Sequence, residues 1–357
     1  MTLLAFAMAM ACNDDNIDPI SKVEPGADAA APTVSIVKPS TGTQIRVEEA
    51  VTSIEIEFIV QDDIELQSVS VQLDGNEITE YSDFKDYRRL QTKYLYSELA
   101  DGDHTLSVIA TDLAGKSTTQ TVTFQKTVPY QPLYEGEVFY MPFDGDLSEL
   151  VSFTNGTAVG TPGYAAGKVG QAYAGATGAS VSFPTDSLIK TQEVSATLWM
   201  KVNGTPPRAG ILTVSALDPA PVVAGTQNLR TKGFRFFREL DGTVLQRFKL
   251  NVGTGAAEAW NDGGTVDPAA GEWVHFAFTV SGTTSRIYIN GVIAPKPEPV
   301  MANPIDWTGC NLLTIMSGAP RFTEWEHFSD LSLMDELRIF NKALTVEEIN
   351  TIMDNEQ

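Results

Sequence analysis

The chain has 357 residues and a formal net charge of −22. This acidity excludes nucleic acid and anionic lipid headgroups as expected partners, because both bind clustered Lys and Arg side chains. The absence of eighteen consecutive apolar residues excludes a membrane-spanning helix. Short alternating apolar and polar runs, separated by Gly, Asn and Pro, predict an all-β protein of two or three domains.

Residues 1–11 form a short apolar leader that ends in small residues directly before Cys12. A segment of this length is typical of a signal peptide. The tetrapeptide Ala9-Met-Ala-Cys12 resembles a bacterial lipoprotein box, which implies that Cys12 is lipidated and becomes the mature N-terminus. The acids that follow Cys12 resemble the signal that sends lipoproteins of Bacteroidetes-type bacteria to the outer cell surface. The alternative is an unmodified cysteine, because Ala9 replaces the usual Leu and no basic residue precedes the leader.

Residues 12–31 are polar, acidic and rich in Pro and Ala, which predicts a flexible tether. Residues 32–126 then carry about seven short strands. Ile54, Ile56 and Phe58 alternate with polar residues in one of them, and an Asp-Gly turn joins two others. This size and pattern predict an immunoglobulin-like β-sandwich. The run "DGDHTLSVIATDLAGKSTTQTVTF" resembles bacterial immunoglobulin-like spacer modules.

Three acids of this first domain, Asp62, Asp63 and Asp112, lie next to predicted turns. They are either calcium ligands or turn acids that accept hydrogen bonds from their own backbone, and the second interpretation is favoured. A Pro-rich segment, residues 127–136, follows and predicts a semi-rigid linker.

Residues 137–357 form the second predicted domain. Residues 193–202 alternate as a strand, and residues 232–252 predict a hairpin around Asp241-Gly242. Residues 273–280 place Val274, Phe276, Phe278 and Val280 on one face, and Asn290-Gly291 predicts a tight turn after the next strand.

The segments "FYMPFDGD", "GQAYAG", "SATLWMKV", "GEWVHFAFTVSGTTSRIYINGV" and "SLMDELRIFNKALTVEEI" occur in this order across the domain. Together they resemble a laminin-G-like, concanavalin A-type jellyroll. The resemblance implies that the first and last strands pair and that a structural calcium lies where they meet. The predicted fold is therefore an immunoglobulin-like sandwich followed by a concanavalin A-like jellyroll.

Calcium is the one cofactor that the residues themselves suggest. Asp144 and Asp146 lie near the start of the second domain and Asp335 lies near its end, so pairing of the first and last strands would bring their oxygens together. Calcium accepts six to eight oxygen ligands, including backbone carbonyls. The alternative is an Asp-Gly turn and a solvated strand end.

The acids of the second domain do not match a glycosidase pattern. Glucanases that share the jellyroll place their carboxylates at alternate positions of one strand, so that all face one cleft. Asp335 and Glu336 are adjacent and are expected to face opposite sides of the sheet. Glu324 and Glu326 lack a third acid at a suitable distance. Zinc spacing, a Gly-x-Ser-x-Gly elbow and a phosphate-binding loop are also missing, so the sequence predicts a protein that is not an enzyme.

Aromatic side chains in loops, flanked by amides and charged groups, are the usual means of holding sugars. Trp199 and Trp273 lie in strong strands and are expected to be structural. The candidate ligand-binding residues lie in irregular segments: Trp260, Asn261, Asp262, Trp307, Arg321 and Trp325. The alternative for each Trp is a plug at the end of the sandwich.

Two further expectations concern the C-terminal part. Thr345 and Glu348 match a capping box, which predicts a helix that closes the chain against the sandwich. Cys310 is expected to be a small buried residue.

The combined organisation resembles the surface glycan-binding lipoproteins of Bacteroidetes polysaccharide-uptake systems. The resemblance implies a polysaccharide or oligosaccharide ligand, an outer-membrane anchor on Cys12 and an outer-membrane transporter as partner. Two alternatives stay open: a concanavalin A-like glycoside hydrolase or lyase, and an adhesin that binds a protein.

Overall fold

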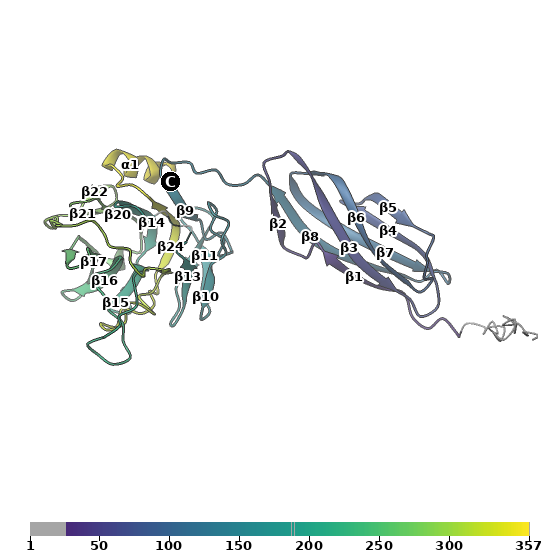
Figure 1. Cartoon of the computed structure of the whole chain (residues 1–357), viewed down its shortest axis with the longest axis horizontal. Coiled ribbons are helices and arrows are strands. Elements are labelled where there is room, and N and C mark those ends of the chain that lie inside the picture. The colour runs from purple at the N-terminus through teal and green to yellow at the C-terminus, as the bar shows by residue number, and fades with distance from the viewer. Residues whose placement is uncertain (1–25, 187, 189, 357) are drawn as a thin grey trace, which may run out of the picture. The chain divides into compact units, whose positions relative to one another are not determined.

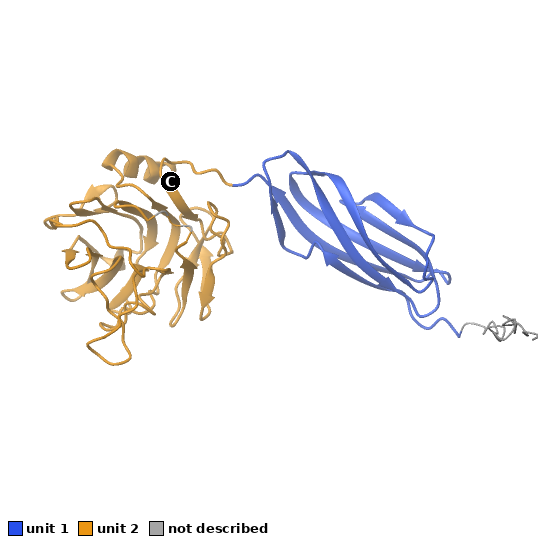
Figure 2. Cartoon of the chain, viewed as in Figure 1, with its two compact units in different colours: residues 1–129 blue, residues 130–357 orange. Residues whose placement is uncertain are grey.

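The computed structural model describes residues 26–186, 188 and 190–356 (Figure 1). The predicted signal peptide, Cys12 and most of the predicted tether lie outside these residues. The chain divides into two compact units between Pro129 and Tyr130 (Figure 2). Across the described part of the chain, helices of the length and apolarity that a bilayer requires are absent.

The first unit is a sandwich of two sheets, as predicted (Figure 1). One sheet has the order β1-β3-β6 and the other the order β2-β8-β7-β4-β5. The strands are β1 (Thr33–Lys38), β2 (Thr43–Arg46), β3 (Val51–Gln61), β4 (Leu66–Leu73), β5 (Asn76–Tyr81), β6 (Arg89–Ala100), β7 (Gly102–Asp112) and β8 (Ser117–Thr127).

The alternation of apolar and polar residues along the strands explains which side chains form the core of the first unit. Ile56 and Phe58 of β3 and Leu106 of β7 are fully buried between the two sheets, whereas their neighbours face solvent. Two of the three turn acids behave as expected, whereas Asp63 accepts a hydrogen bond from the distant Ala29 N–H at 3.3 Å. Asp62 accepts hydrogen bonds from the N–H groups of residues 64 and 65, and Asp112 accepts one from Lys116.

The second unit is a sandwich of two eight-stranded sheets (Figure 1). The first contains β10 (Thr157–Val159), β13 (Ser180–Pro184), β23 (Leu312–Ile315), β15 (Arg208–Val214), β16 (Phe234–Asp241), β17 (Leu245–Gly253), β18 (Glu258–Asn261) and β19 (Thr265–Val266). The second contains β11 (Gly163–Ala166), β12 (Gln171–Ala174), β24 (Leu333–Phe340), β14 (Val194–Lys201), β20 (Trp273–Val280), β21 (Ser285–Ile289), β22 (Val292–Ile293) and β9 (Glu137–Met141).

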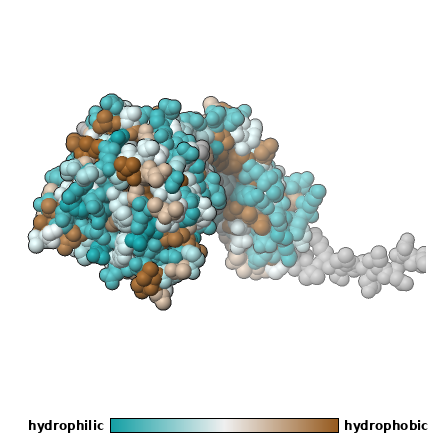
Figure 3. Space-filling view, turned by 60° about the vertical axis from the view of Figure 1, so that its left-hand side comes forward, coloured by the Kyte–Doolittle hydropathy of each residue, from teal (hydrophilic) through white to brown (hydrophobic). Residues whose placement is uncertain are grey.

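The inner faces of the two sheets form one core. The four predicted residues of β20, Val274, Phe276, Phe278 and Val280, all belong to it. Phe276 stacks on Phe248 of β17 with ring centroids 4.0 Å apart, which joins the two sheets. Cys310 is buried beside this core, and burial raises the pKa of its thiol to about 11. The outer surface is mainly hydrophilic with separate hydrophobic patches, as the face in Figure 3 shows.

The predicted pairing of the first and last strands of the second unit and its predicted C-terminal helix are confirmed. β9 pairs with β24, so the first and last strands of the unit are neighbours. Helix α1 (Val346–Asn355) begins at the predicted capping box, in which Thr345 and Glu348 exchange hydrogen bonds. Its buried residues, Ile349 and Ile352, cover Ala277, Tyr288 and Phe340 on the outer face of the second sheet.

The segment predicted as a linker is shorter in the structure. Tyr130 lies in the second unit, where its hydroxyl contacts both Glu137 and Arg338. The Tyr134 ring contacts the edge of Phe340. Composition alone did not reveal these contacts, because the two Tyr side chains meet partners more than 200 residues away in the sequence.

Candidate functional site

Two of the three predicted binding tryptophans lie side by side. Trp260 is on β18, on the face of the first sheet that points away from the core, and Trp325 is in the irregular segment before β24. Their ring centroids are 5.9 Å apart with an interplanar angle of 33°, and both rings are partly exposed. We call this pair the tryptophan platform. An exposed pair of aromatic faces provides an apolar surface for a flat ligand.

A buried aromatic layer supports the platform. Phe237 of β16 meets the edge of Trp260, and Phe322 meets the edge of Trp325. His327 stacks on Phe322 at 4.3 Å, and its Nε2 lies 3.1 Å from the Glu239 carboxylate. Burial lowers the pKa of His327, while its hydrogen bond lowers the pKa of Glu239 to about 2. A neutral imidazole therefore donates to an ionised carboxylate and fixes the ring layer.

The charged groups around the platform are largely paired with one another. Arg230 lies over the Trp325 ring at 4.9 Å, and its Nε is 3.5 Å from Glu258. Lys249 contacts Glu239 at 3.1 Å and Asp262 at 3.2 Å. These pairs leave little net charge for an ionic ligand.

The remaining predicted ligand residues have other roles. Asn261 is buried and bonds the Ser285 carbonyl and the Gly263 N–H, so it faces inward. Asp262 is exposed beside the platform, paired with Lys249. Trp307 donates to the Thr191 carbonyl and packs on the core, as the plug alternative described. Arg321 is buried and donates to Asn311. The structure therefore brings Trp260, Asp262 and Trp325 together and separates the other three.

A depression of about 540 Å³ lies next to the platform. It is lined by Thr177, Gly178, Thr205, Pro206, Pro207, Arg208, Glu326, Phe328, Ser329 and Leu331. Sequence reasoning missed these residues. A single aromatic residue in the same irregular segment, Phe328, three positions after Trp325, is too weak a sequence signal to identify them.

The expected geometry of Asp335 and Glu336 is wrong. Thr197 pairs with Arg338 and Trp199 pairs with Asp335, so Glu336 and Leu337 both stand opposite Leu198 in a β-bulge. Glu336 has φ +51°, the left-handed conformation that such a bulge uses. The bulge interrupts the period of two and turns both acids away from the core, while the residues on either side of them, Met334 and Leu337, face it.

Both acids are occupied by neighbours, which is the structural reason against a catalytic pair. Glu336 accepts from the Tyr140 hydroxyl and pairs with Arg338 at 3.2 Å. Asp335 is fully buried and accepts from the backbone N–H groups of Lys168 and Val169. Burial raises the pKa of Asp335 to about 7, with a smaller contribution from the Glu336 charge.

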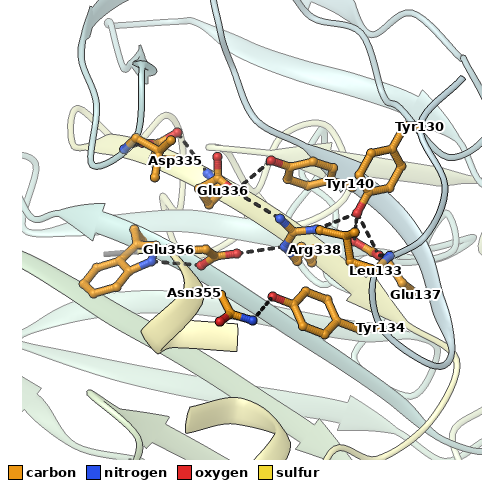
Figure 4. A network of polar contacts seen from close by, with 12 residues as sticks. Tyr130, Leu133, Tyr134, Glu137, Tyr140, Asp335, Glu336, Arg338, Asn355 and Glu356 are labelled. Atoms are coloured by element: carbon orange, nitrogen blue, oxygen red, sulfur yellow. Dashed lines mark hydrogen bonds and ion pairs between the residues drawn. The ribbon is translucent and has the colours of Figure 1, made fainter. Parts of the chain in front are cut away.

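Arg338 is the centre of the network that surrounds these acids (Figure 4). It pairs with Glu137, Glu336 and Glu356 and donates to the Tyr130 hydroxyl. Its guanidinium also lies 3.6 Å from the Tyr140 ring centroid. A depression of about 550 Å³ lies over this network. Because the hydrogen bonds of this network tie β9, β24 and α1 together, we assign it a structural role.

The predicted calcium ligands do not form a group that could hold a metal ion within the described residues. Asp144 accepts from the Gln171 N–H, Asp146 accepts from the Ser148 N–H, and Asp335 accepts from the 168–169 turn. All three carboxylates thus fix local backbone. Calcium binding stays a prediction, which a melting experiment with EDTA can test.

Comparison with known proteins gave two family matches. Residues 175–350 match the concanavalin A-like lectin/glucanases superfamily, and residues 32–108 match a bacterial Ig domain. No curated protein matches the sequence.

Two solved structures are similar to this chain at low identity. Domain 4 of AbnA, a GH43 extracellular arabinanase from Geobacillus stearothermophilus solved with arabinotriose, is 23% identical, with a TM-score of 0.45 over 60% of this chain and 97% of that one. The binding domain of botulinum neurotoxin DC, solved with SialylT, is 14% identical, with a TM-score of 0.44 over 62% of this chain. The match spans about half the length of the toxin domain, 52%. The two matches thus identify an immunoglobulin-like domain followed by a concanavalin A-like jellyroll domain.

Proposed function

We propose that the protein binds neutral carbohydrate, without chemistry, on the tryptophan platform. The observation that carries this proposal is the pair of partly exposed rings, Trp260 and Trp325, held by a rigid aromatic layer. Sugar rings present flat C–H faces that pack on aromatic rings, and the surrounding polar groups can bond hydroxyls. The superfamily match supports the same ligand class.

The chemical character of the surface favours a neutral ligand. The protein is strongly acidic overall, with a net charge of −22, which disfavours polyuronates and sulfated glycans. The cations near the platform, Arg230 and Lys249, are already paired with carboxylates.

The proposed cellular setting extends this binding role. The protein would be anchored to the outer membrane through Cys12 and would concentrate polysaccharide near an outer-membrane transporter of a glycan-uptake system. The resemblance of the leader and of the domain order to surface lipoproteins supports this setting. Mass spectrometry of the protein from its native membrane would reveal acylation of Cys12, and an unmodified Cys12 would contradict it.

The first test is affinity electrophoresis on a panel of arabinan, xylan, mannan, β-glucan and starch, with alginate and chondroitin sulfate as anionic comparisons. Arabinan belongs in the panel because the arabinanase domain was solved with arabinotriose. We expect retardation by at least one neutral polysaccharide without release of reducing ends. Release of reducing ends would indicate a hydrolase instead. Retardation by none, with capture of a protein, would favour an adhesin.

The platform is tested by Trp260→Ala and Trp325→Ala. A bound sugar covers apolar surface of each ring and removes it from water. Loss of either ring is therefore expected to weaken binding about tenfold. The melting temperature should change little, because both rings are partly exposed outside the core. Tyr164→Ala, which removes an exposed ring from β11, is the matched control. Unchanged binding by the double tryptophan variant would exclude the platform.

A further inference from the structure

The depression beside the platform has the size and walls of a ligand site. Its volume of about 540 Å³ falls within the range typical of small-molecule pockets. Phe328 lines it and exposes 48% of its surface. Pro206, Pro207 and Leu331 complete an apolar wall.

Two charged side chains supply the polar part of the depression. Arg208 and Glu326 both line it and both are exposed. Within the described residues neither side chain takes part in an ion pair, and Arg208 has one weak hydrogen bond, to the Trp325 carbonyl at 3.4 Å. An aromatic face with one free cation and one free carboxylate suits a ring that has an apolar face and hydroxyls at its edge.

The base of the depression is rigid. Asp330, which lies between the lining residues Ser329 and Leu331, forms a fully buried ion pair with Arg238 at 2.7 Å. The Gly210 N–H donates to the Phe328 carbonyl at 3.1 Å, which ties the segment to β15. Glu326 has φ +62°, a strained conformation for a residue other than glycine. Such strain persists where the surroundings fix it, and it is frequent at binding sites.

One segment contributes to both the depression and the platform, because Glu326 lines the depression and directly follows Trp325. Trp325 and Phe328 lie three residues apart, so their Cα atoms are within about 11 Å. Between them His327 is buried, which fixes the segment and leaves Trp325 on the platform and Phe328 in the depression. A ligand a few sugar units long can therefore reach from one ring to the other.

We propose that the depression is a second sugar-binding subsite, in which Phe328 stacks on a sugar ring and Arg208 and Glu326 bond its hydroxyls. This inference rests on the proposed function, because the same neutral glycan chain occupies both the platform and the depression. One guanidinium and one carboxylate give the subsite no net charge, which again fits a neutral sugar.

The test measures affinity against ligand length. Isothermal titration would use arabino-, xylo-, manno- and cello-oligosaccharides of two to eight units, with the full chain. Affinity of the unsubstituted protein should rise with length and then level off. Phe328→Ala should not change the affinity for the shortest bound ligand. It should lower the affinity for the longest ligands about tenfold, because it removes the contact that only they reach. Arg208→Ala and Glu326→Gln should remove a smaller part of the gain with length, and Tyr164→Ala should change neither affinity nor its length dependence.

The outcomes separate this inference from the function on which it rests. If Phe328→Ala binds every length normally while Trp325→Ala is weakened, the second subsite is wrong and the platform stands. If Phe328→Ala weakens the shortest and longest ligands equally, the depression is the primary site and the proposed arrangement is overturned. If the unsubstituted protein binds none of these sugars, both proposals fail.

Discussion

The second unit contains a buried histidine whose protonation differs between the folded and the unfolded chain. His275 on β20 is fully buried, and both of its ring nitrogens lack a hydrogen-bond partner within the described structure. Its ring meets the edge of Trp199 at 5.2 Å. Burial lowers the pKa of His275 to about 3, well below its ordinary value of 6.5. The folded protein therefore holds a neutral imidazole that the unfolded chain would protonate.

This residue predicts acid sensitivity of the second unit. Below pH 6.5 the unfolded chain binds a proton that the folded chain does not, so the free energy of unfolding falls as pH falls from 6.5 toward 3. One such histidine contributes up to about 1.4 kcal/mol per pH unit. His275→Leu should reduce this slope by that amount in urea titrations at pH 4 to 7.

Tryptophan fluorescence reports this transition selectively, because the five Trp residues of the chain all lie beyond residue 130. His104→Gln, in the first unit, is the control and should leave the slope unchanged. An equal slope for His275→Leu and the unsubstituted protein would mean that the imidazole is protonated in the folded state as well.

At the scale of elements, the C-terminal helix is held at both ends. The capping box fixes its start, and Glu356 after its end accepts from the Trp199 indole at 2.9 Å and from Arg338 at 2.8 Å. Between these ends, Ile349 and Ile352 are fully buried against the second sheet. The helix is thus part of the unit's packing.

The free energy of unfolding that a substitution in this helix costs should increase with the burial of the side chain. Ile352→Ala opens a cavity and is expected to lower the free energy of unfolding by about 2–4 kcal/mol. Thr345→Ala removes the cap and should cost about 1 kcal/mol. The exposed Thr351→Ala should stay within about 0.5 kcal/mol. Urea titration measures all three, and a cost for Ile352→Ala as small as that for Thr351→Ala would show that the helix is not packed in solution.

Local sequence patterns predicted most of these elements. Alternation identified β14 and β20, Asn290-Gly291 identified the β21–β22 turn, and Thr345 identified the helix start. Each of these signals acts within a few residues, which is why one sequence sufficed.

Features set by distant partners escaped prediction. The β24 bulge depends on the register against β14, about 140 residues away, so period-two reasoning misplaced Glu336. The binding surface shows the same limit. Trp260 and Trp325 were both predicted to lie in irregular segments, which is wrong for Trp260 because it lies in β18. Only the fold shows that the two rings meet and that Trp307 packs on the core. Phe328 carried no pattern of its own.

At the scale of the whole molecule, the two units are separately organised. Each has its own pair of sheets and its own core. The boundary lies before Tyr130, because this residue contacts Glu137 and Arg338 of the second unit. Tyr134 also contacts Phe340 and Asn355.

Fragments that start on either side of these tyrosines should differ in stability. Residues 130–357 are expected to fold and to melt as the second unit does in the full chain. Residues 137–357 lack the contacts of Tyr130 and Tyr134 and should melt roughly 5 °C lower. Circular dichroism measures both transitions. Equal melting temperatures would place the boundary at residue 137, as composition alone suggests.

The bulge at Glu336 also bears on how relatives of this domain are aligned. A bulge adds one residue to a strand without lengthening the strand's partner, so a relative without it would have one residue fewer in β24. An alignment that leaves out the gap would match the inward residues after the bulge, such as Leu337, to outward residues of that relative. Placing the gap at Glu336 keeps Arg338 and its equivalents in the same column.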